Sequence, residues 1–156
     1  MTDVLEAQGL IAGLAWEHPS SAFHPAPTPA VATGFAYTVP GTVDQLVVAV
    51  SFQLVTDGNA ADRLVTFQFV DYDGTSYAPV AAPFTQAASL TTLYTFAVGI
   101  QQFGADDAAA IGCGIPPVKL PSGCGVKVTL GSVQVGDQVS AVALLLNQWP
   151  VRPPLR

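Results

Sequence analysis

The chain has little charge, few cysteines and histidines, and no long apolar run. Among its 156 residues, five are lysine or arginine and eleven are aspartate or glutamate, so 10% are charged, against about 25% in a typical soluble domain. Its exterior must therefore consist mainly of Ala, Thr, Ser, Val, Gln, Gly and Pro. Because scattered charge keeps folded domains apart in solution, such an exterior suits a subunit that is covered by copies of itself or by other proteins.

The shortage of basic residues argues against binding to nucleic acid. The formal net charge is −6, no basic residue precedes Arg63, and none lies between Arg63 and Lys119. A protein that binds DNA or RNA needs a basic face that displaces counterions from the phosphates. No such face can be drawn on this sequence, so we predict no nucleic-acid partner.

The hydrophobic pattern predicts neither a membrane span nor a secretory signal. The apolar run at 139–146 is too short to cross a bilayer. The first residues lack the basic region of a signal peptide, and Glu6 and Gln8 interrupt their apolar side chains. We therefore expect no membrane partner and synthesis in a cytoplasm.

The cysteines and histidines match no zinc motif. Cys113 and Cys124 are the two cysteines, and His18 and His24 are the two histidines. Two small buried thiols are the interpretation we favour for the cysteines, with a disulfide between neighbouring strands as the alternative. Both histidines lie beside prolines, where a general base would be held poorly, so we interpret them as surface residues.

No motif for catalysis is present. The sequence contains neither a Gly-x-Ser-x-Gly elbow nor a phosphate-binding loop. The run from Asp71 to Gly74 resembles the first part of a calcium loop, but the third acid and the closing glutamate are absent, so a hairpin turn is favoured. Asp106 and Asp107 are interpreted as part of a solvated loop. We predict that the protein is not an enzyme and has no catalytic, cofactor-binding or metal-binding residue, and no cofactor.

Alternation of apolar and polar residues predicts an all-β fold. Residues 115–120 are predicted to be an edge segment, because their prolines cannot donate hydrogen bonds to a strand ladder. The Gly- and Ala-rich stretch 104–114 is expected to be a loop. The predicted strands are 35–39, 46–54, 64–70, 76–80, 90–100, 124–130 and 138–149. With the edge segment this gives about eight strands, which favours an antiparallel β-sandwich of the eight-stranded jelly-roll type. The Cys-Trp-Cys spacing of an immunoglobulin domain is missing.

The sequence divides into an N-terminal arm and Pro-rich strap at 1–33, a sandwich domain at 34–150 and an extended C-terminal tail at 151–156. Four prolines, at positions 19, 25, 27 and 29, are expected to keep the strap out of helices and strand ladders. The apolar residues of the arm could wrap the chain's own domain or reach a neighbour. We favour the neighbour, because such arms commonly connect subunits.

Five short sequence phrases follow one another in a fixed order along residues 35–149. The phrases are Val39-Pro-Gly41, Ser51-Phe-Gln-Leu-Val-Thr56, Asp62-Arg-Leu-Val65, Gln86-Ala-Ala-Ser89 and Val135-Gly-Asp-Gln-Val-Ser140. In this order they resemble small β-sandwich structural proteins of tailed bacteriophage virions. The resemblance implies a head decoration, minor capsid, or collar or tail-associated protein that is located in the virion and made in the host cytoplasm. It implies partners among its own copies and other virion proteins, such as the major capsid, collar or tail proteins, and no catalytic residue.

Two charged residues in these phrases suggest structural roles. Arg63 at a strand start is expected to hold a loop by pairing with an acid, and Asp137 is placed to cap backbone amides of a turn. Two further functions were weighed against the virion protein. A carbohydrate- or receptor-binding module would show an exposed row of aromatic residues, and an enzyme would need a cleft with convergent acids.

Overall fold

The computed structural model describes residues 20–151, so most of the predicted arm (1–19) and most of the predicted tail (152–156) lie outside the described residues. The described part is all-β and contains ten strands. They are β1 (Ser20–Pro25), β2 (Phe35–Thr38), β3 (Val43–Val55), β4 (Leu64–Val70), β5 (Ser76–Ala81), β6 (Thr91–Val98), β7 (Ala110–Ile115), β8 (Lys119–Leu120), β9 (Gly125–Gly131) and β10 (Gln138–Pro150). Within residues 20–151 no helix is long and apolar enough to cross a membrane.

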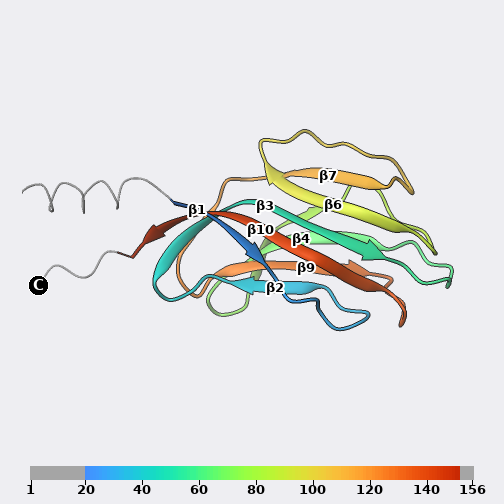
Figure 1. Cartoon of the computed structure of the whole chain (residues 1–156), viewed down its shortest axis with the longest axis horizontal. Coiled ribbons are helices and arrows are strands. Elements are labelled where there is room, and N and C mark those ends of the chain that lie inside the picture. Colours follow the sequence, from blue (N-terminus) through green and yellow to red (C-terminus); the bar gives the residue numbers. More distant parts are fainter. Residues whose placement is uncertain (1–19, 152–156) are drawn as a thin grey trace, which may run out of the picture.

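The strands form a sandwich of two sheets (Figure 1). The larger sheet has the order β1-β10-β3-β6-β7, with β8 paired to the end of β3, and the smaller has the order β2-β9-β4-β5. All pairs are antiparallel except β6 and β7. When the short strands β7 and β8 are set aside, the remaining eight cross between the sheets in the order of a jelly roll. This confirms the predicted fold class, to which two short strands are added.

Aromatic side chains from both sheets fill the space between them. Phe52 on β3 stacks on Tyr94 of β6, with ring centroids 5.5 Å apart. Phe67 on β4 stacks on Phe96 of β6 at 5.5 Å and so joins the two sheets. These four side chains are almost completely buried, and each such burial stabilises the fold by roughly 1.5–3 kcal/mol.

Two edge strands correct the sequence-based predictions. β1 lies in the segment that the prolines were expected to keep out of ladders, yet it pairs antiparallel with β10 from Ser20 to Pro25. The ladder forms because β1 is an edge strand, Pro25 is its last residue, and the next prolines follow it. The sandwich therefore begins at Ser20 rather than at 34.

β7 is the second correction, because it occupies the last five residues of the predicted loop at 104–114. Ile111, Cys113 and Ile115 point into the core, whereas the alternate positions are alanine or glycine. The small outward residues conceal the alternation that would have identified the strand. Phe103 fills the space over one of them, because its ring stands where a Cβ of Gly112 would be.

The sandwich has two distinct ends. At one end, β1 begins beside the last residues of β10, since Ser20 pairs with Gln148, and the described chain therefore starts and stops on the same side (Figure 1). At the other end lie the connections 26–34, 56–63, 82–90 and 132–137. We call it the Arg63 end, after the residue that joins several of these loops.

Candidate assembly surface

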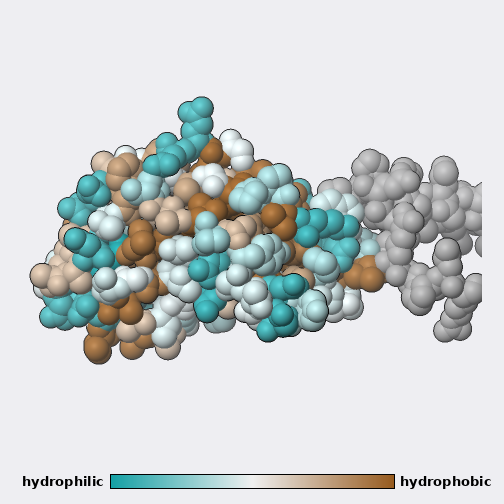
Figure 2. Space-filling model, turned by 180° about the vertical axis from the view of Figure 1, so that it is seen from behind, coloured by the Kyte–Doolittle hydropathy of each residue, from teal (hydrophilic) through white to brown (hydrophobic). Residues whose placement is uncertain are grey.

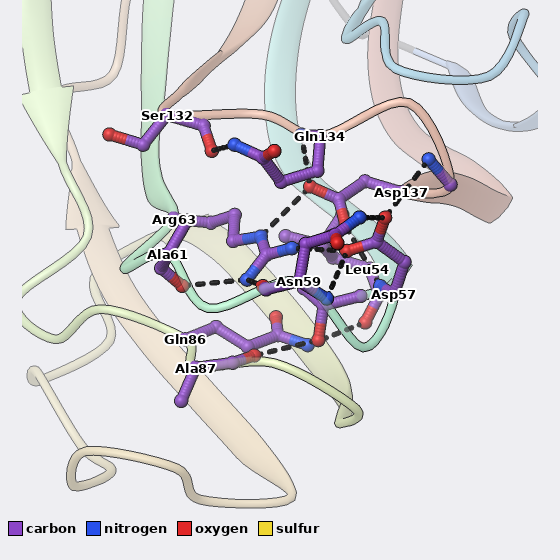
Figure 3. Close-up of polar contacts among 12 residues, drawn as sticks. Leu54, Asp57, Asn59, Ala61, Arg63, Gln86, Ala87, Ser132, Gln134 and Asp137 are labelled. Carbon is purple, nitrogen blue, oxygen red and sulfur yellow. Dashed lines mark hydrogen bonds and ion pairs between the residues drawn. The ribbon is translucent and has the colours of Figure 1, made fainter.

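Arg63 at the start of β4 is completely buried, and each of its guanidinium N–H groups has an acceptor (Figure 3). Nε donates to Oδ2 of Asp137 at 2.9 Å, and Nη2 donates to Oδ1 of Asp137 at 3.0 Å and to Oδ1 of Asp57 at 2.7 Å. Nη1 donates to the carbonyl oxygens of Asn59 at 2.9 Å and Ala61 at 2.6 Å. All five donors of the side chain are thus used.

The sequence-based role of Arg63 is confirmed, and the structure identifies its partners. The neighbouring acid Asp62 is exposed and makes no ion pair with it, whereas the partners Asp57 and Asp137 are 6 and 74 residues away. Such a separation could not be read from the sequence.

Asp137 also has the predicted capping role. Its Oδ1 accepts the backbone N–H of Asp57 at 2.9 Å, and its Oδ2 accepts that of Gln134 at 2.8 Å. Burial by itself raises the pKa of this carboxyl, but the hydrogen bonds from Arg63, Gln134 and Asp57 outweigh that effect, and the pKa is lowered from its ordinary value. Asp137 is therefore held as a carboxylate.

The cluster of Arg63, Asp57 and Asp137 holds together two connections that cross between the sheets. Asp57 lies between β3 and β4, and Asp137 lies between β9 and β10, so each belongs to a connection that crosses from one sheet to the other. The backbone of Arg63 also exchanges two hydrogen bonds with Gln86, at 2.9 and 3.0 Å. Because both acids are occupied by these contacts, the cluster is structural rather than a site for acid–base chemistry.

The outer face of the larger sheet carries no charged side chain over most of its area. The alternation and the pairing register define its outward positions. These positions are Ser21, Phe23 and Pro25 on β1, Ser140, Ala143, Leu145 and Asn147 on β10, Leu46, Ala49, Ser51, Gln53 and Val55 on β3, Thr91, Leu93, Thr95 and Ala97 on β6, and Ala110, Gly112 and Gly114 on β7. On β7 the ring of Phe103 covers Gly112, and the carbonyl oxygen of Ile100 stands where a Cβ of Gly114 would be. We call this surface the uncharged face. Charge enters at one margin, where Lys119 pairs with Asp44 at 3.1 Å.

Several apolar side chains protrude from the uncharged face. Phe23 is 68% exposed, and Leu145, its direct neighbour across the β1–β10 pair, is 41% exposed. Leu93 and Val55 are exposed to a similar degree. Phe23 and Leu145 adjoin each other, whereas Ser51 and Gln53 lie between this pair and Val55 along the sheet. Exposed apolar side chains that adjoin one another are typical of a surface that meets another protein.

The outer face of the smaller sheet has a different character. Lys127 lies near its centre, paired in register with Gln68 and Ala36, and the neighbouring outward positions include Thr66 and Thr129. Figure 2 views the molecule from behind and shows hydrophilic and hydrophobic residues interspersed on this side. The larger sheet therefore offers the more apolar of the two faces.

The tyrosines do not form the exposed row that a sugar-binding face would need. Tyr94 is completely buried, and its pKa is raised by burial to about 12. Tyr37 is half-buried and donates its hydroxyl to Oε1 of Gln45 at 2.8 Å. Tyr72 and Tyr77 are exposed on the β4–β5 hairpin, where an open groove of about 370 Å³ is lined by Tyr72, Asp71 and Lys127 among others.

Both cysteines are buried free thiols, which confirms the interpretation favoured from the sequence. Cys113 lies on β7 of the larger sheet, and Cys124 lies just before β9 of the smaller sheet. Burial raises the pKa of the Cys113 and Cys124 thiols, and the carboxylate of Asp71 adds to this effect at Cys124. His24 lies half-buried on β1, with its ring 5.7 Å from that of Tyr37, rather than on a strap. His18 is outside the described residues.

The two acidic pairs considered as cation sites are used by the backbone. Asp73 accepts the N–H of Thr75 at 2.8 Å in the β4–β5 turn, as predicted for a hairpin. Asp107 accepts the N–H of Ala87 at 3.1 Å and so joins two loops. Across residues 20–151, no group of three histidine, cysteine or acidic side chains could hold a metal ion.

Comparisons with known proteins found similarity in structure but not in sequence. No protein-family model matches the chain, and no curated protein matches its sequence. A chain from the T13 particle of infectious bursal disease virus aligns with 83% of this chain at 13% identity and a TM-score of 0.43. A chain from the Gx strain of the same virus aligns with 87% at 12% identity and a TM-score of 0.41. The present chain spans about a third of the length of those two chains.

Proposed function

We propose that this protein is a structural subunit of a virus particle, and more specifically a decoration or minor capsid protein of a tailed bacteriophage. The observation that carries the proposal is the uncharged face, which five neighbouring strands of the larger sheet share. The jelly-roll order of the strands adds support, because viral capsid domains use this architecture. The ordered phrases along residues 35–149 favour a phage protein within that class.

The physical reason is the cost of removing charge from water. A subunit interface that buries an unpaired charge loses several kcal/mol, on the order of the cost seen for isolated buried ions. The core of a protein interface is accordingly depleted in charged residues. On the uncharged face that depletion extends from β1 to β7, whereas the acidic residues Asp62, Asp73 and Asp106 lie in loops outside the strands.

The chain ends supply the second proposed contact. Residues 1–16 include Val4, Leu5, Leu10, Ile11 and Trp16, and the described chain begins at Ser20 beside the end of β10. We propose that the arm reaches a neighbouring subunit from this end. Removal of residues 1–19 should then abolish incorporation into particles while the sandwich remains folded.

The function is tested by purifying particles from the source of the chain on a density gradient and quantifying the protein in each fraction by mass spectrometry. The proposal expects the chain to co-sediment with nuclease-resistant particles in a fixed ratio to the major coat protein. A chain found solely in the soluble fractions would contradict it. In the matched experiment, recombinant chain is added to particles that lack it, and its binding to them is measured.

The groove on the β4–β5 hairpin favours one alternative, a carbohydrate- or receptor-binding module of a tail or head appendage. Tyr72 is 80% exposed beside Asp71 and Lys127, and sugars commonly stack on aromatic rings that stand beside polar groups. Glycan binding that is lost in Tyr72→Ala and kept in Tyr77→Ala would support this alternative.

A further inference from the structure

We infer that β1 pairs edge to edge, in antiparallel direction, with β1 of a second copy of this chain, so that the larger sheets of two copies form one continuous sheet. The inference rests on the proposed function, since it names one contact between neighbouring subunits. It follows from the free backbone groups of β1, from its lack of charge and from the exposed ring of Phe23.

Alternate residues of β1 turn their backbone groups away from the sheet. β1 is the terminal strand of the larger sheet, where it pairs with β10 (Figure 1). The N–H of Ala26 donates to the carbonyl oxygen of Val142 at 2.9 Å and continues that ladder. Because the bonding direction alternates along an antiparallel strand, the backbone groups of Ser21, Phe23 and Pro25 point to the free edge. Proline has no N–H, so this edge offers the N–H groups of Ser21 and Phe23 and the carbonyl oxygens of all three residues.

The other edges of the two sheets are protected from such pairing in ways that are common in natural proteins. On β7, the N–H and the carbonyl oxygen of Gly112 both bond to the backbone of Phe103. β5 contains Pro79, and its register shifts beside Ala78, which has a φ of 47°. β2 is only four residues long. β1 has six residues and an unbroken register with β10, which makes it the edge that is most open to a further strand.

The alternation of side chains limits the register in which two β1 strands can pair. Residues that lie opposite each other point to the same side of the sheet, so Phe23 can lie opposite Ser21, Phe23 or Pro25 of the second copy. When Phe23 lies opposite Phe23, each Ser21 lies opposite Pro25, and all outward-pointing backbone positions of both strands are used. Each N–H of Ser21 and Phe23 then finds a carbonyl oxygen on the second copy. In the other two registers, one end of β1 extends beyond its partner.

This register joins the exposed apolar side chains of the two copies into one row. Leu145 adjoins Phe23 across the β1–β10 pair, and the two side chains are 41% and 68% exposed. Across two copies the row runs Leu145, Phe23, Phe23 and Leu145, on strands that are about 4.8 Å apart. The two rings lose contact with water where they meet, and each holds the other against the neighbouring Leu145. Aromatic pairs across strands stabilise a sheet.

Charge permits this contact between two like copies. The whole chain carries a formal charge of −6, so a contact through its acidic loops would place like charges together. β1 contains no acidic residue, lysine or arginine. Its histidine, His24, packs against Tyr37 with ring centroids 5.7 Å apart, and in the proposed register it lies opposite Ala22 of the second copy. The two edges can therefore approach without like-charge repulsion.

The first test is sedimentation equilibrium of the full chain and two matched variants. The contact is smaller than a standard interface of about 800 Å² on each partner, so we expect a Kd of about 0.1 mM. Phe23→Pro removes an outward N–H and the ring but leaves the bonds to β10, and it should be monomeric. Ser76→Pro removes an outward N–H from the edge of β5, because the neighbouring Thr75 bonds to Asp71 of β4's turn, and it should dimerise like the wild type.

Circular dichroism checks that both variants are folded. A wild-type chain that stays monomeric up to about 1 mM, or a dimer that survives in Phe23→Pro, would overturn the inference.

The second test uses the wild-type chain alone and shows which backbone groups the contact covers. Amide hydrogen exchange is followed by NMR at about 0.05 and 1 mM, and for a Kd of about 0.1 mM the amides of Ser21 and Phe23 should exchange about threefold more slowly at the higher concentration. The amide of Ser76 should exchange at the same rate at both. A dimer that leaves exchange at Ser21 and Phe23 unchanged would overturn the inference. Failure of these tests leaves the particle experiment unaffected, because absence of the chain from purified particles is a separate result.

Discussion

The Arg63 end and the uncharged face treat charge in opposite ways. At the Arg63 end, an arginine and an aspartate are both completely buried, and every donor of the arginine is satisfied. On the uncharged face, charge is absent where water could reach it. The comparison indicates that the few charges of this chain serve its own loops, whereas its sheet surface is suited to contact with other proteins.

Loss of the buried arginine should have the largest effect. In Arg63→Met the carboxylate of Asp137 stays buried without its partner, which is expected to lower the free energy of unfolding by about 3–5 kcal/mol. Urea unfolding followed by tryptophan fluorescence measures this. The control is Asp62→Asn at the exposed neighbour, where a change within about 0.5 kcal/mol is expected. Equal stability of Arg63→Met and the wild type would show that the cluster does not hold the loops.

Acid should weaken the same cluster. The pKa of Asp137 is lowered in the folded state, so its contribution is fully present above the pKa of an unfolded aspartate, about 3.9, and is lost as the pH falls through the lower folded value. Stability should therefore fall below about pH 4. Asp137→Asn should be less stable at pH 7 and should show a weaker acid dependence in urea unfolding between pH 7 and 3. Parallel curves for both proteins would contradict this.

A close approach of two strands near the Arg63 end should have an intermediate effect. A Cβ on Gly34 would overlap the carbonyl oxygen of Val128 on β9, so Gly34→Ala must displace β2. We expect a loss of about 1–3 kcal/mol in thermal or urea unfolding. Gly58→Ala is the control, because the nearest atom to its added Cβ, Oγ of Ser89, is 3.7 Å away. A loss that is equal in the two variants would exclude the steric explanation.

The smallest effect is expected at a buried hydroxyl that, unlike the guanidinium of Arg63, has no hydrogen-bond partner among the described residues. The hydroxyl of Tyr94 is buried and has no hydrogen-bond partner among residues 20–151. Tyr94→Phe removes this unpaired group and keeps the ring that stacks on Phe52, so stability should rise by up to about 1 kcal/mol. Calorimetry of the two proteins measures the change, and a marked loss of stability would reveal a partner for the hydroxyl.

Much of the fold could be predicted from alternation, and the failures have a common cause. β4 was predicted with its observed bounds, 64–70, because both of its neighbours cover it and its inward residues are large. β1 and β7 were missed because they are edge strands, where proline and glycine are tolerated and conceal the alternation. The uncharged face itself could be anticipated only as a low overall charge, since its outline depends on pairing register.

The Arg63 cluster was predictable in kind but not in composition. The sequence indicated that Arg63 would meet an acid and that Asp137 would cap a turn. Arg63 contacts Asp137 because the connection from β9 to β10 crosses from one sheet to the other and brings position 137 beside position 63. The residues near either position in the sequence do not indicate such a long-range contact.

The central claim is that protein, rather than water, covers the uncharged face. The most direct measurement is the rate at which a maleimide labels Leu145→Cys, compared with Gln68→Cys, as the concentration of the full chain is raised. The native thiols are buried and contribute a slow background. The account predicts that labelling slows with concentration at position 145 and stays constant at position 68. Constant labelling at both positions would contradict it.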